Sequence, residues 1–198
     1  MNSADAVVIG GGILGTSTAF HLTNAGVSNV ALIERKFIGA GATGKSHSLV
    51  RMHSTNPHDA DLAQMSLPYF QHWSELVGAG DCEFIQTGVF RFANGRQEAK
   101  VRANVDMLRG IGVNTWFVDP AEIQSIDPGL SVHDLPGAAW EPDSGYADPL
   151  ATANGFARAT SDRGGTVRTG VSVTGILVDK GGVVGVDTTD GRIATETV

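Results

Sequence analysis

The 198-residue sequence contains a single cysteine, Cys82, and no apolar run long enough to cross a bilayer. One cysteine cannot form an internal disulfide, and such sparse use is typical of a reducing compartment. Without a long apolar run, we expect no transmembrane helix and no membrane partner. The first expected strand begins at about residue 6, which leaves no room for a signal peptide. These absences predict a soluble, cytoplasmic protein.

Basic residues are also scarce. Fourteen Lys and Arg stand against 21 Asp and Glu, which gives a net charge of −7. A balance of this sign argues against nucleic acid or an anionic membrane as the main partner. The sequence has no internal repeat and no low-complexity segment. It does have 26 glycines and 41% hydrophobic residues, which suit a soluble α/β protein of one large domain or two small ones.

The glycines gather first in a turn near the N-terminus. A short apolar strand over Ala6–Ile9 runs into Gly10, Gly12 and Gly15, which occupy the glycine positions of G-x-G-x-x-G. In this pattern the first glycine permits a tight turn and the second lets a pyrophosphate approach the backbone. The third lets the following helix pack closely on the sheet. Phosphates would then lie on free N–H groups at the N-terminus of that helix.

An acidic residue follows the second expected strand. Val30–Ile33 is a short apolar run, and Glu34 comes directly after it, nineteen positions beyond Gly15. A carboxylate there can accept hydrogen bonds from both hydroxyls of an adenosine ribose and would repel the 2′-phosphate of NADP. The alternative is an ordinary βαβ unit with a surface glutamate. The combination of strand, turn, helix, strand and acid favours dinucleotide binding.

A second glycine-rich stretch distinguishes among dinucleotides. Residues 39–46 read Gly-Ala-Gly-Ala-Thr-Gly-Lys-Ser, where an NAD-binding domain would resume its sheet after a short crossover. Small residues with many backbone donors suit a long cofactor that lies extended, with amides at its phosphates and ring. A flexible surface loop is the alternative. The segment therefore favours a long cofactor in an extended form over NAD.

At this point the sequence resembles the D-amino-acid-oxidase-like superfamily of FAD-dependent oxidoreductases. The resemblance is carried by the glycine turn of residues 10–15, by Glu34 and Arg35, and by residues 41–51. The last segment is most similar to the sarcosine and dimethylglycine oxidase or dehydrogenase branch. This implies a Rossmann-like FAD-binding domain of the glutathione-reductase type, which is an α/β fold with a three-layer β-β-α arrangement. An α+β substrate domain would be inserted in it.

The resemblance also implies how the chain is divided. Residues 1–55 would form the first part of the FAD-binding domain, 56–145 a helical segment and partial substrate domain, and 146–198 the second part of the FAD-binding domain. The similarity covers only the N-terminal half of a typical member, and Val198 falls where the next parallel strand should begin. We therefore expect a C-terminally incomplete fold, as a fragment or a split subunit completed by a second chain.

Periodicity and turn signals predict the remaining elements. Helices are expected over Ile13–Asn24, 59–77 with a kink or break at Pro68, 97–109, a short stretch after the cap Asp119, and 148–163 after the cap Asp148. Strands are expected over 83–92, 114–118, 138–141 and 166–168. The tail alternates with period two over 171–179, 183–188 and 192–197, which predicts an antiparallel meander.

The resemblance assigns cofactor contacts to residues in the two glycine-rich segments, at the end of the second strand and in the meander. These are Gly10, Gly12, Ile13, Leu14, Gly15, Glu34, Arg35, Gly41, Ala42, Thr43, Gly44, Lys45, Ser46, His47 and Val173. Arg35 would lie along the adenine, unless it is simply an exposed arginine. The backbone of Val173 would contact the adenine.

Two residues are candidates for catalysis. Arg51 could present its guanidinium to a substrate carboxylate or a positive charge to the N1–C2 region of the flavin, and an internal salt bridge is the alternative. His47 could tether or contact the flavin, but the related branch places its tethering histidine where Lys45 stands. A non-covalent role or an ordinary loop histidine is therefore preferred. The spacings of His47, His53 and His58 suit no metal site, so no metal is assigned.

The resemblance implies oxidation of an amine or N-methylated amino acid to an imine by hydride transfer to the flavin. Electrons would then pass to oxygen or to a carrier. Two alternatives stay open from the sequence. One is oxidation of a hydroxy acid or glycerol phosphate on the same fold, and the other is a non-catalytic FAD- or nucleotide-binding fragment that needs a partner chain.

Overall fold

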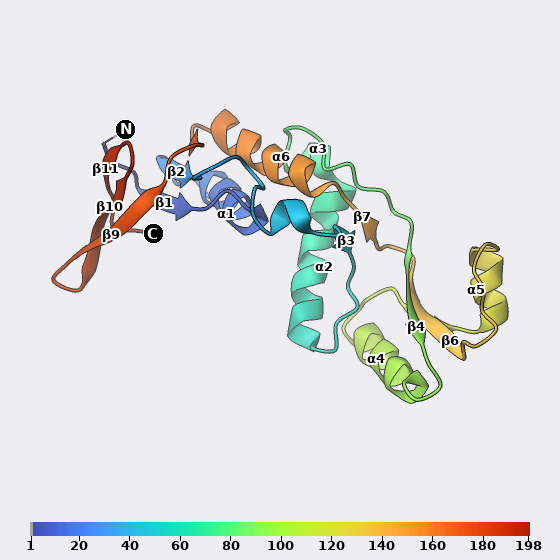
Figure 1. The fold of residues 1–198 in the computed structure, drawn as a ribbon. Coiled ribbons are helices and arrows are strands. Elements are labelled where there is room, and N and C mark those ends of the chain that lie inside the picture. Colours follow the sequence, from blue (N-terminus) through green and yellow to red (C-terminus); the bar gives the residue numbers. More distant parts are fainter. Residues whose placement is uncertain (1) are drawn as a thin grey trace. The chain divides into compact units, whose positions relative to one another are not determined.

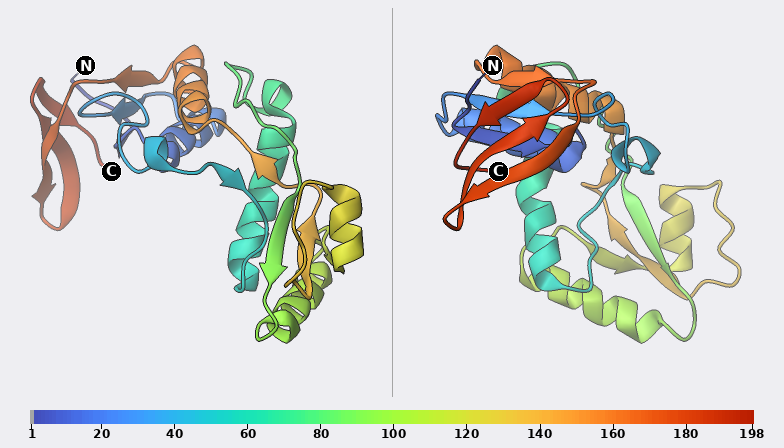
Figure 2. Two further views of the ribbon diagram at one scale, coloured as in Figure 1. Left: turned by 45° about the vertical axis from the view of Figure 1, so that its right-hand side comes forward. Right: turned by 60° about the vertical axis from the view of Figure 1, so that its left-hand side comes forward.

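The computed structural model describes residues 2–198, which form two compact units (Figures 1 and 2). The first unit comprises the chain up to Ser48, His72–Glu83 and Asp148–Val198. The second comprises Leu49–Gln71 and Phe84–Ala147. Neither unit is continuous in sequence, so each is assembled from segments that lie far apart along the chain.

A parallel sheet lies at the centre of the first unit. Its strands β1 (Ala6–Ile9), β2 (Val30–Ile33) and β8 (Thr166–Arg168) are arranged in the order β1-β2-β8, and both pairings are parallel. All four β2 residues are at most 1% exposed. Because side chains alternate across a strand, an unbroken apolar run such as Val30–Ile33 requires a covering layer on each face of the sheet.

Helices form one of these layers. Val30 and Leu32 pack with Ala19 of α1 (Ile13–Asn24) and with Ala153 and Ala157 of α6 (Pro149–Asp162). Helix α3 (Trp73–Leu76) packs against α6 in this layer, since the Trp73 and Phe156 ring centroids are 4.8 Å apart. Asp148 caps α6 as expected, because its side chain accepts from the Ala151 N–H at 2.6 Å.

A meander forms the other layer. Strands β9 (Val173–Asp179), β10 (Gly182–Thr188) and β11 (Gly191–Ala194) pair antiparallel in the order β11-β10-β9. Ala31 and Ile33 of β2 pack against Val186 and Ile193 of this meander. The expected three-layer β-β-α arrangement and the meander are therefore confirmed.

Strand β1 is one of the two edge strands of the parallel sheet among the described strands, and the last residues of the chain run beside it. The Val7 N–H donates to the Thr197 carbonyl at 3.0 Å, and the Ala4 N–H donates to the Ala194 carbonyl at 2.9 Å. The residues after the meander thus lie next to the strand that leads into the glycine turn.

The second unit is built on an antiparallel sheet. Strands β4 (Val89–Ala93), β6 (Gly137–Glu141) and β5 (Trp116–Val118) are arranged in the order β4-β6-β5. One face packs against α4 (Glu98–Gly110) and the other against α5 (Pro120–Ile126). Asp119 and Glu122 form the expected capping box of α5. These elements confirm an α+β unit inserted between segments of the first.

Two smaller features complete the second unit. Helix α2 (Pro57–Gln71) packs on α4 through Ala60 and Leu108. The two-residue strands β3 (Leu49–Val50) and β7 (Gly145–Tyr146) pair antiparallel. Neither strand is predicted from the sequence, because a two-residue strand is too short to show periodicity.

Two expected elements differ in extent. The helix expected over 59–77 ends at Gln71, and His72 (φ −126°) separates it from α3, so the break lies four residues beyond Pro68. The strand expected over 83–92 begins only at Val89. Gly88 has φ +70°, and its N–H donates to the Ser144 carbonyl at 2.9 Å, so the chain before β4 pairs with the residues that follow β6 instead of extending β4.

No helix within residues 2–198 combines the length and the apolar character needed to cross a membrane.

Candidate functional site

The glycine turn between β1 and α1 has the shape that its sequence predicts. Gly10 has φ +104°, a conformation that residues with a side chain rarely adopt. A Cβ on Gly15 would overlap the carbonyl oxygen of Gly10, so the first turn of α1 lies directly against the end of β1. Only glycine fits at this contact, and the close packing brings the N-terminus of the helix to the carboxyl end of the sheet.

The carboxylate of Glu34 is held against this turn. Its Oε2 accepts from the Gly11 N–H and its Oε1 from the Lys36 N–H, both at 2.7 Å. Glu34 is half-buried, and its backbone N–H donates to the Arg168 carbonyl at 2.8 Å. An ionised carboxylate can accept about four hydrogen bonds, so acceptor capacity remains for a ligand. The acid and the turn, 24 residues apart from Gly10 to Glu34, therefore form one site.

The second glycine-rich segment is folded onto the same turn. The Gly39 N–H donates to the Gly11 carbonyl at 2.8 Å, and the Ile13 N–H donates to Thr43 Oγ1 at 2.9 Å. Thr43 begins the 3-10 helix η1 (Thr43–Lys45), where the sequence predicted only a loop. Beyond Thr43, the predicted residues Gly44, Lys45, Ser46 and His47 are exposed, as are Gly41 and Ala42 before it.

The N-terminus of α1 retains the features of an anion site. Its N-cap residue, Gly12, makes no side-chain capping hydrogen bond, and the first turn contains no acidic residue. Leu14 in that turn is 82% exposed. The Ile13 N–H is engaged by Thr43, and the remaining N–H groups of the first turn and the helix dipole favour a phosphate at such a position. The donors, the ribose-type acceptor at Glu34 and the folded loop together fit the diphosphate and ribose of FAD.

The remaining predicted contacts flank Glu34. The Val171 N–H donates to the Glu34 carbonyl at 3.1 Å, which brings the start of β9, with Val173, alongside the acid. Val173 is partly buried against the core beneath the meander. Arg35 is exposed on the next position of the chain. Both residues are therefore near the acid, at the end of the sheet where the adenine half of the cofactor was expected.

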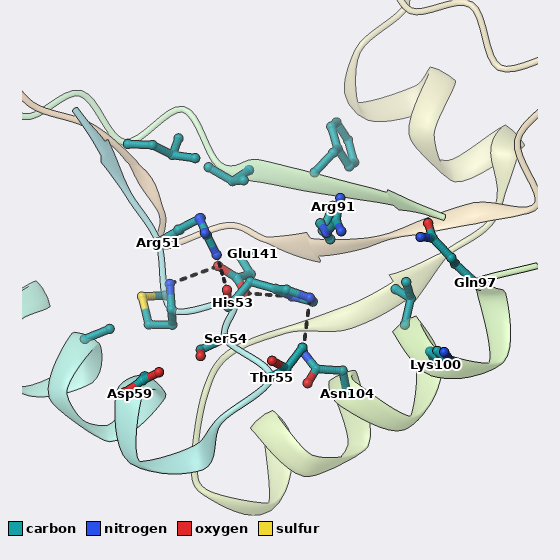
Figure 3. Close-up of a pocket in the computed structure, with 16 residues that line it drawn as sticks. Arg51, His53, Ser54, Thr55, Asp59, Arg91, Gln97, Lys100, Asn104 and Glu141 are labelled. Atoms are coloured by element: carbon teal, nitrogen blue, oxygen red, sulfur yellow. Dashed lines mark hydrogen bonds and ion pairs between the residues drawn. The ribbon is translucent and has the colours of Figure 1, made fainter. Parts of the chain in front are cut away.

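A separate cavity of about 880 Å³ lies within the second unit, and Arg51 lines it (Figure 3). Its walls come from residues 49–55, the start of α2, strand β4, helix α4 and the end of β6. The Arg51 guanidinium donates to the His53 carbonyl and forms no ion pair within residues 2–198. The internal salt bridge considered from the sequence is thus absent from the described chain, and the guanidinium keeps further N–H groups for a ligand.

A buried polar cluster fixes the segment that carries Arg51. Glu141 is 1% exposed and His53 is 7% exposed, and Glu141 Oε1 lies 3.4 Å from His53 Nδ1. Glu141 Oε2 accepts from the Met52 N–H at 3.2 Å and from the Ser144 hydroxyl at 2.9 Å. A single carboxylate at the end of β6 therefore holds the backbone and the side chain of residues 52 and 53.

Helix α4 contacts this cluster from the other side. The Asn104 side-chain amide is 3.1 Å from His53 Nε2 (Figure 3). If that amide donates, the imidazole proton is on Nδ1, facing the carboxylate, since a neutral imidazole has one donor and one acceptor. Neither His53 Nδ1 nor Glu141 Oε1 has a hydrogen-bond partner within the described chain, so each atom depends on the other for electrostatic compensation.

The contact between Glu141 and His53 is not predicted from the sequence. His53 was considered only as a metal ligand, and Glu141 only as the last residue of a strand. An acid directly after the small apolar run 137–140 was the one available signal, because such a run predicts burial of its neighbours. Within residues 2–198, no group of three or more His, Cys, Asp or Glu is placed to hold a metal ion.

Comparison with known families identifies the class. A family model described as "FAD dependent oxidoreductase", DAO, matches residues 5–198. The chain therefore belongs to the DAO family of FAD-dependent oxidoreductases, as the glycine turn and the acid indicated.

Relatives within the family include two dehydrogenase or oxidase proteins and one regulatory protein. Human mitochondrial sarcosine dehydrogenase is 34% identical over 100% of this chain and 22% of its own length. Sarcosine oxidase subunit beta of Rhodobacter capsulatus is 29% identical over 96% of this chain and 47% of its own length. The mouse mitochondrial pyruvate dehydrogenase phosphatase regulatory subunit is 27% identical over 96% and 22%.

A solved structure matches the fold as a whole. L-proline dehydrogenase from P. horikoshii superimposes with a TM-score of 0.92 at 29% identity, over 100% of this chain and 53% of that one. The chain thus spans about a fifth to a half of the length of the relatives it matches.

Proposed function

We propose that this chain provides the FAD-binding part, and one side of the substrate site, of an oxidoreductase that acts on an amine or N-methylated amino acid. The observation that carries the proposal is the contact between the Glu34 carboxylate and the Gly11 N–H at 2.7 Å, which joins the glycine turn and the acid in one site. The sarcosine dehydrogenase and sarcosine oxidase relatives support an amine as the substrate.

Each half of the site has a distinct role in this proposal. The N–H groups at the start of α1, apart from that of Ile13, hold the diphosphate, and Glu34 accepts from the ribose hydroxyls. Thr43 and the residues to His47 supply further hydroxyl and backbone donors along the cofactor, while Arg35 and the backbone of Val173 lie at the adenine. When bound, FAD would supply the hydride acceptor for oxidation of a C–N bond to an imine.

Arg51 binds the carboxylate of the substrate in this proposal. Its guanidinium lines the cavity of the second unit, and the Glu141 cluster holds its segment in place. Arginine suits this role because its planar donors match a carboxylate in a bidentate way. Electrons leave to oxygen or to a carrier, and the imine is released to water for hydrolysis.

Binding of FAD tests the first half of the proposal. Glu34→Gln keeps the size of the side chain but removes its charge, and charge-assisted hydrogen bonds are about twice as strong as neutral ones. We expect about tenfold weaker FAD binding, measured by quenching of flavin fluorescence. Glu75→Gln, on an exposed residue of α3, should leave the affinity unchanged. Equal affinities for both variants and the parent protein would reject the site.

Substrate class is tested by anaerobic flavin reduction in the full gene product. Sarcosine, dimethylglycine, proline and glycine are compared with lactate and glycerol 3-phosphate. Reduction by amines alone supports the proposal, whereas reduction by the hydroxy compounds alone would favour the alternative hydroxy-acid or glycerol-phosphate activity. Acid denaturation tests attachment: with Lys45 at the position of the tethering histidine, the flavin should stay in the supernatant.

A second candidate function is a non-catalytic FAD-binding protein, or a subunit that is active only with a partner chain. The regulatory-subunit relative and the beta-subunit relative favour it. Flavin that binds but is reduced by none of these substrates would support it, and turnover by the chain without any partner would reject it.

A further inference from the structure

Two cations on the cavity wall have no role in the function proposed above. Arg91 comes from β4 and Lys100 from α4. Both side chains are exposed, and neither makes an ion pair or a hydrogen bond within residues 2–198. By contrast, Arg102 on the same helix is paired with Glu98 at 2.9 Å. The two unpaired cations share a cavity rather than being dispersed over the surface.

The geometry of both elements directs these residues to the same space. Along β4, Val89, Arg91 and Ala93 alternate with Phe90 and Phe92, and Ala93 packs on the α4 side of the sheet while Phe90 packs on the α5 side. Arg91 therefore faces α4. Figure 3 shows Arg91 at the sheet, among the residues that line the cavity.

Helix α4 presents a matching polar face. The N-cap Gln97 and the α4 residues Lys100, Val101 and Asn104 line the cavity, with the spacing of one helix face. Gln97 and Asn104 can donate hydrogen bonds from neutral amides on either side of the Lys100 ammonium. The wall formed by β4 and α4 therefore carries four donor side chains, Arg91, Gln97, Lys100 and Asn104, two of them charged, beside the apolar Val89, Phe90 and Val101.

The charge balance of the cavity opposes that of the whole chain. Arg51, Arg91 and Lys100 line it together with only two carboxylates. One of these, Glu141, is 1% exposed and engaged by Met52, Ser144 and His53, which leaves Asp59 as the exposed acid. The whole protein carries a net charge of −7, so three of its 14 Lys and Arg around one cavity amount to a local positive site.

We infer that this cavity binds a dicarboxylate, with Arg51 at one carboxylate and Arg91 together with Lys100 at the second. The inference rests on the proposed amine-oxidising function and deepens it: the substrate is an N-alkylated amino acid with an acidic side chain. A volume of about 880 Å³ is within the range of small-molecule sites and accommodates such a ligand. Arg91 and Lys100 have no acidic partner within residues 2–198, so their guanidinium and ammonium groups can pair with the second carboxylate of the ligand.

Direct binding tests the inference without FAD. Succinate and butyrate, which have four carbons each and differ in one carboxylate, are titrated calorimetrically into the protein. We expect succinate to bind at least tenfold more tightly. Arg91→Met and Lys100→Met should each reduce this preference to about threefold or less. Arg158→Met, on an exposed residue of α6 in the first unit, should leave it intact.

Three results would overturn the inference: equal affinities for succinate and butyrate, a preference unchanged in both variants, or competition by sulfate as strong as by succinate. Arg91→Lys and Lys100→Arg retain charge and should retain most of the preference. If they lose it while circular dichroism shows native folding, charge does not explain recognition and the inference fails.

Turnover separates this inference from the proposed function. N-methylaspartate and 2-(methylamino)butanoate are compared as reductants of the flavin in the holoenzyme. A kcat/KM at least tenfold higher for N-methylaspartate supports the inference. Equal values would overturn the inference and leave amine oxidation standing. If neither compound nor any other amine reduces the flavin while succinate still binds selectively, the proposed function fails and the dicarboxylate site stands.

Discussion

Gly15 is in contact with the carbonyl oxygen of Gly10, and a methyl group there has no space. Because the obstacle is backbone, Gly15→Ala can be accommodated only if α1 moves away from β1. We expect a loss of about 1–3 kcal/mol in the free energy of unfolding, the usual cost of overpacking, together with weaker FAD binding. Urea denaturation followed by circular dichroism measures the first effect.

The matched control is Gly175→Ala in β9, where a Cβ would meet no atom within 4 Å and φ is not positive. It should change the stability little. If Gly15→Ala were as well tolerated as this control, the close approach of helix and strand would be wrong.

Glu141 is a single buried carboxylate with contacts to three neighbours, Met52, His53 and Ser144. In Glu141→Gln the amide nitrogen would face the His53 Nδ1–H, which places two donors together. Leaving a buried polar group unsatisfied costs about 1–3 kcal/mol, so we expect destabilisation of that size. Urea denaturation followed by tryptophan fluorescence is suitable, since Trp116 and Trp140 both lie in the second unit.

Glu98→Gln serves as the comparison for that variant. Glu98 is half-exposed and paired only with Arg102 on the same helix, so its replacement should cost about 0.5 kcal/mol or less. Equal losses for the two variants would show that burial does not distinguish Glu141.

At the scale of elements, Asp148 and Pro149 determine where α6 begins. The Asp148 carboxylate accepts from the Ala151 N–H at 2.6 Å, and removal of such a cap costs about 0.5–2 kcal/mol. Asp148→Ala should therefore lower the free energy of unfolding by that amount. Asp162→Ala, at the opposite end of α6, should be neutral or slightly stabilising, because an acid at a helix C-terminus opposes the dipole. If Asp148→Ala were as stable as Asp162→Ala, the Asp148 carboxylate would not stabilise the start of α6.

Elements were predictable from the sequence where local chemistry determines them. The apolar run Val30–Ile33, the caps Asp119 and Asp148, and the tail turns each carry their own signal, and the structure has the corresponding elements. The elements whose extent was wrong depend on distant partners. Before β4, Ile85 pairs with Tyr146 and the Gly88 N–H donates to the Ser144 carbonyl, and both partners lie more than 50 residues further along the chain.

The site shows the same division. The glycine turn and Glu34 follow a spacing that reflects direct backbone contact, so the sequence alone indicates them. The cavity instead combines β4, α4 and β6, and its charged residues Arg91 and Lys100 have no pattern in the sequence. Only the pairing of Val89 with Glu141 across β4 and β6 places the buried acid beside that wall.

At the scale of the whole molecule, neither unit corresponds to a single stretch of chain. The first unit has three segments and the second has two. Residues 2–48 supply β1, α1 and β2, whereas β8, α6 and the meander come from beyond residue 147. A single cut between Ser48 and Leu49 therefore separates strands that are paired in one sheet, β2 and β8.

We expect that protein cleaved at a protease site inserted between Ser48 and Leu49 remains associated under native conditions. The two pieces share the β2–β8 pairing and the apolar packing on both faces of β2. Size-exclusion chromatography before and after denaturation measures this. Elution of two separate fragments without denaturant would show that the first unit is not held together by its sheet.

The ties at the glycine turn are made entirely by groups of the chain itself. Gly11 is bonded to Glu34 and to Gly39, and Ile13 is bonded to Thr43, so three distant stretches of backbone are already immobilised. The contacts that order these loops therefore belong to the fold. A diphosphate that binds at the glycine turn contacts backbone that the chain itself has ordered, so its binding energy goes into affinity instead of loop closure.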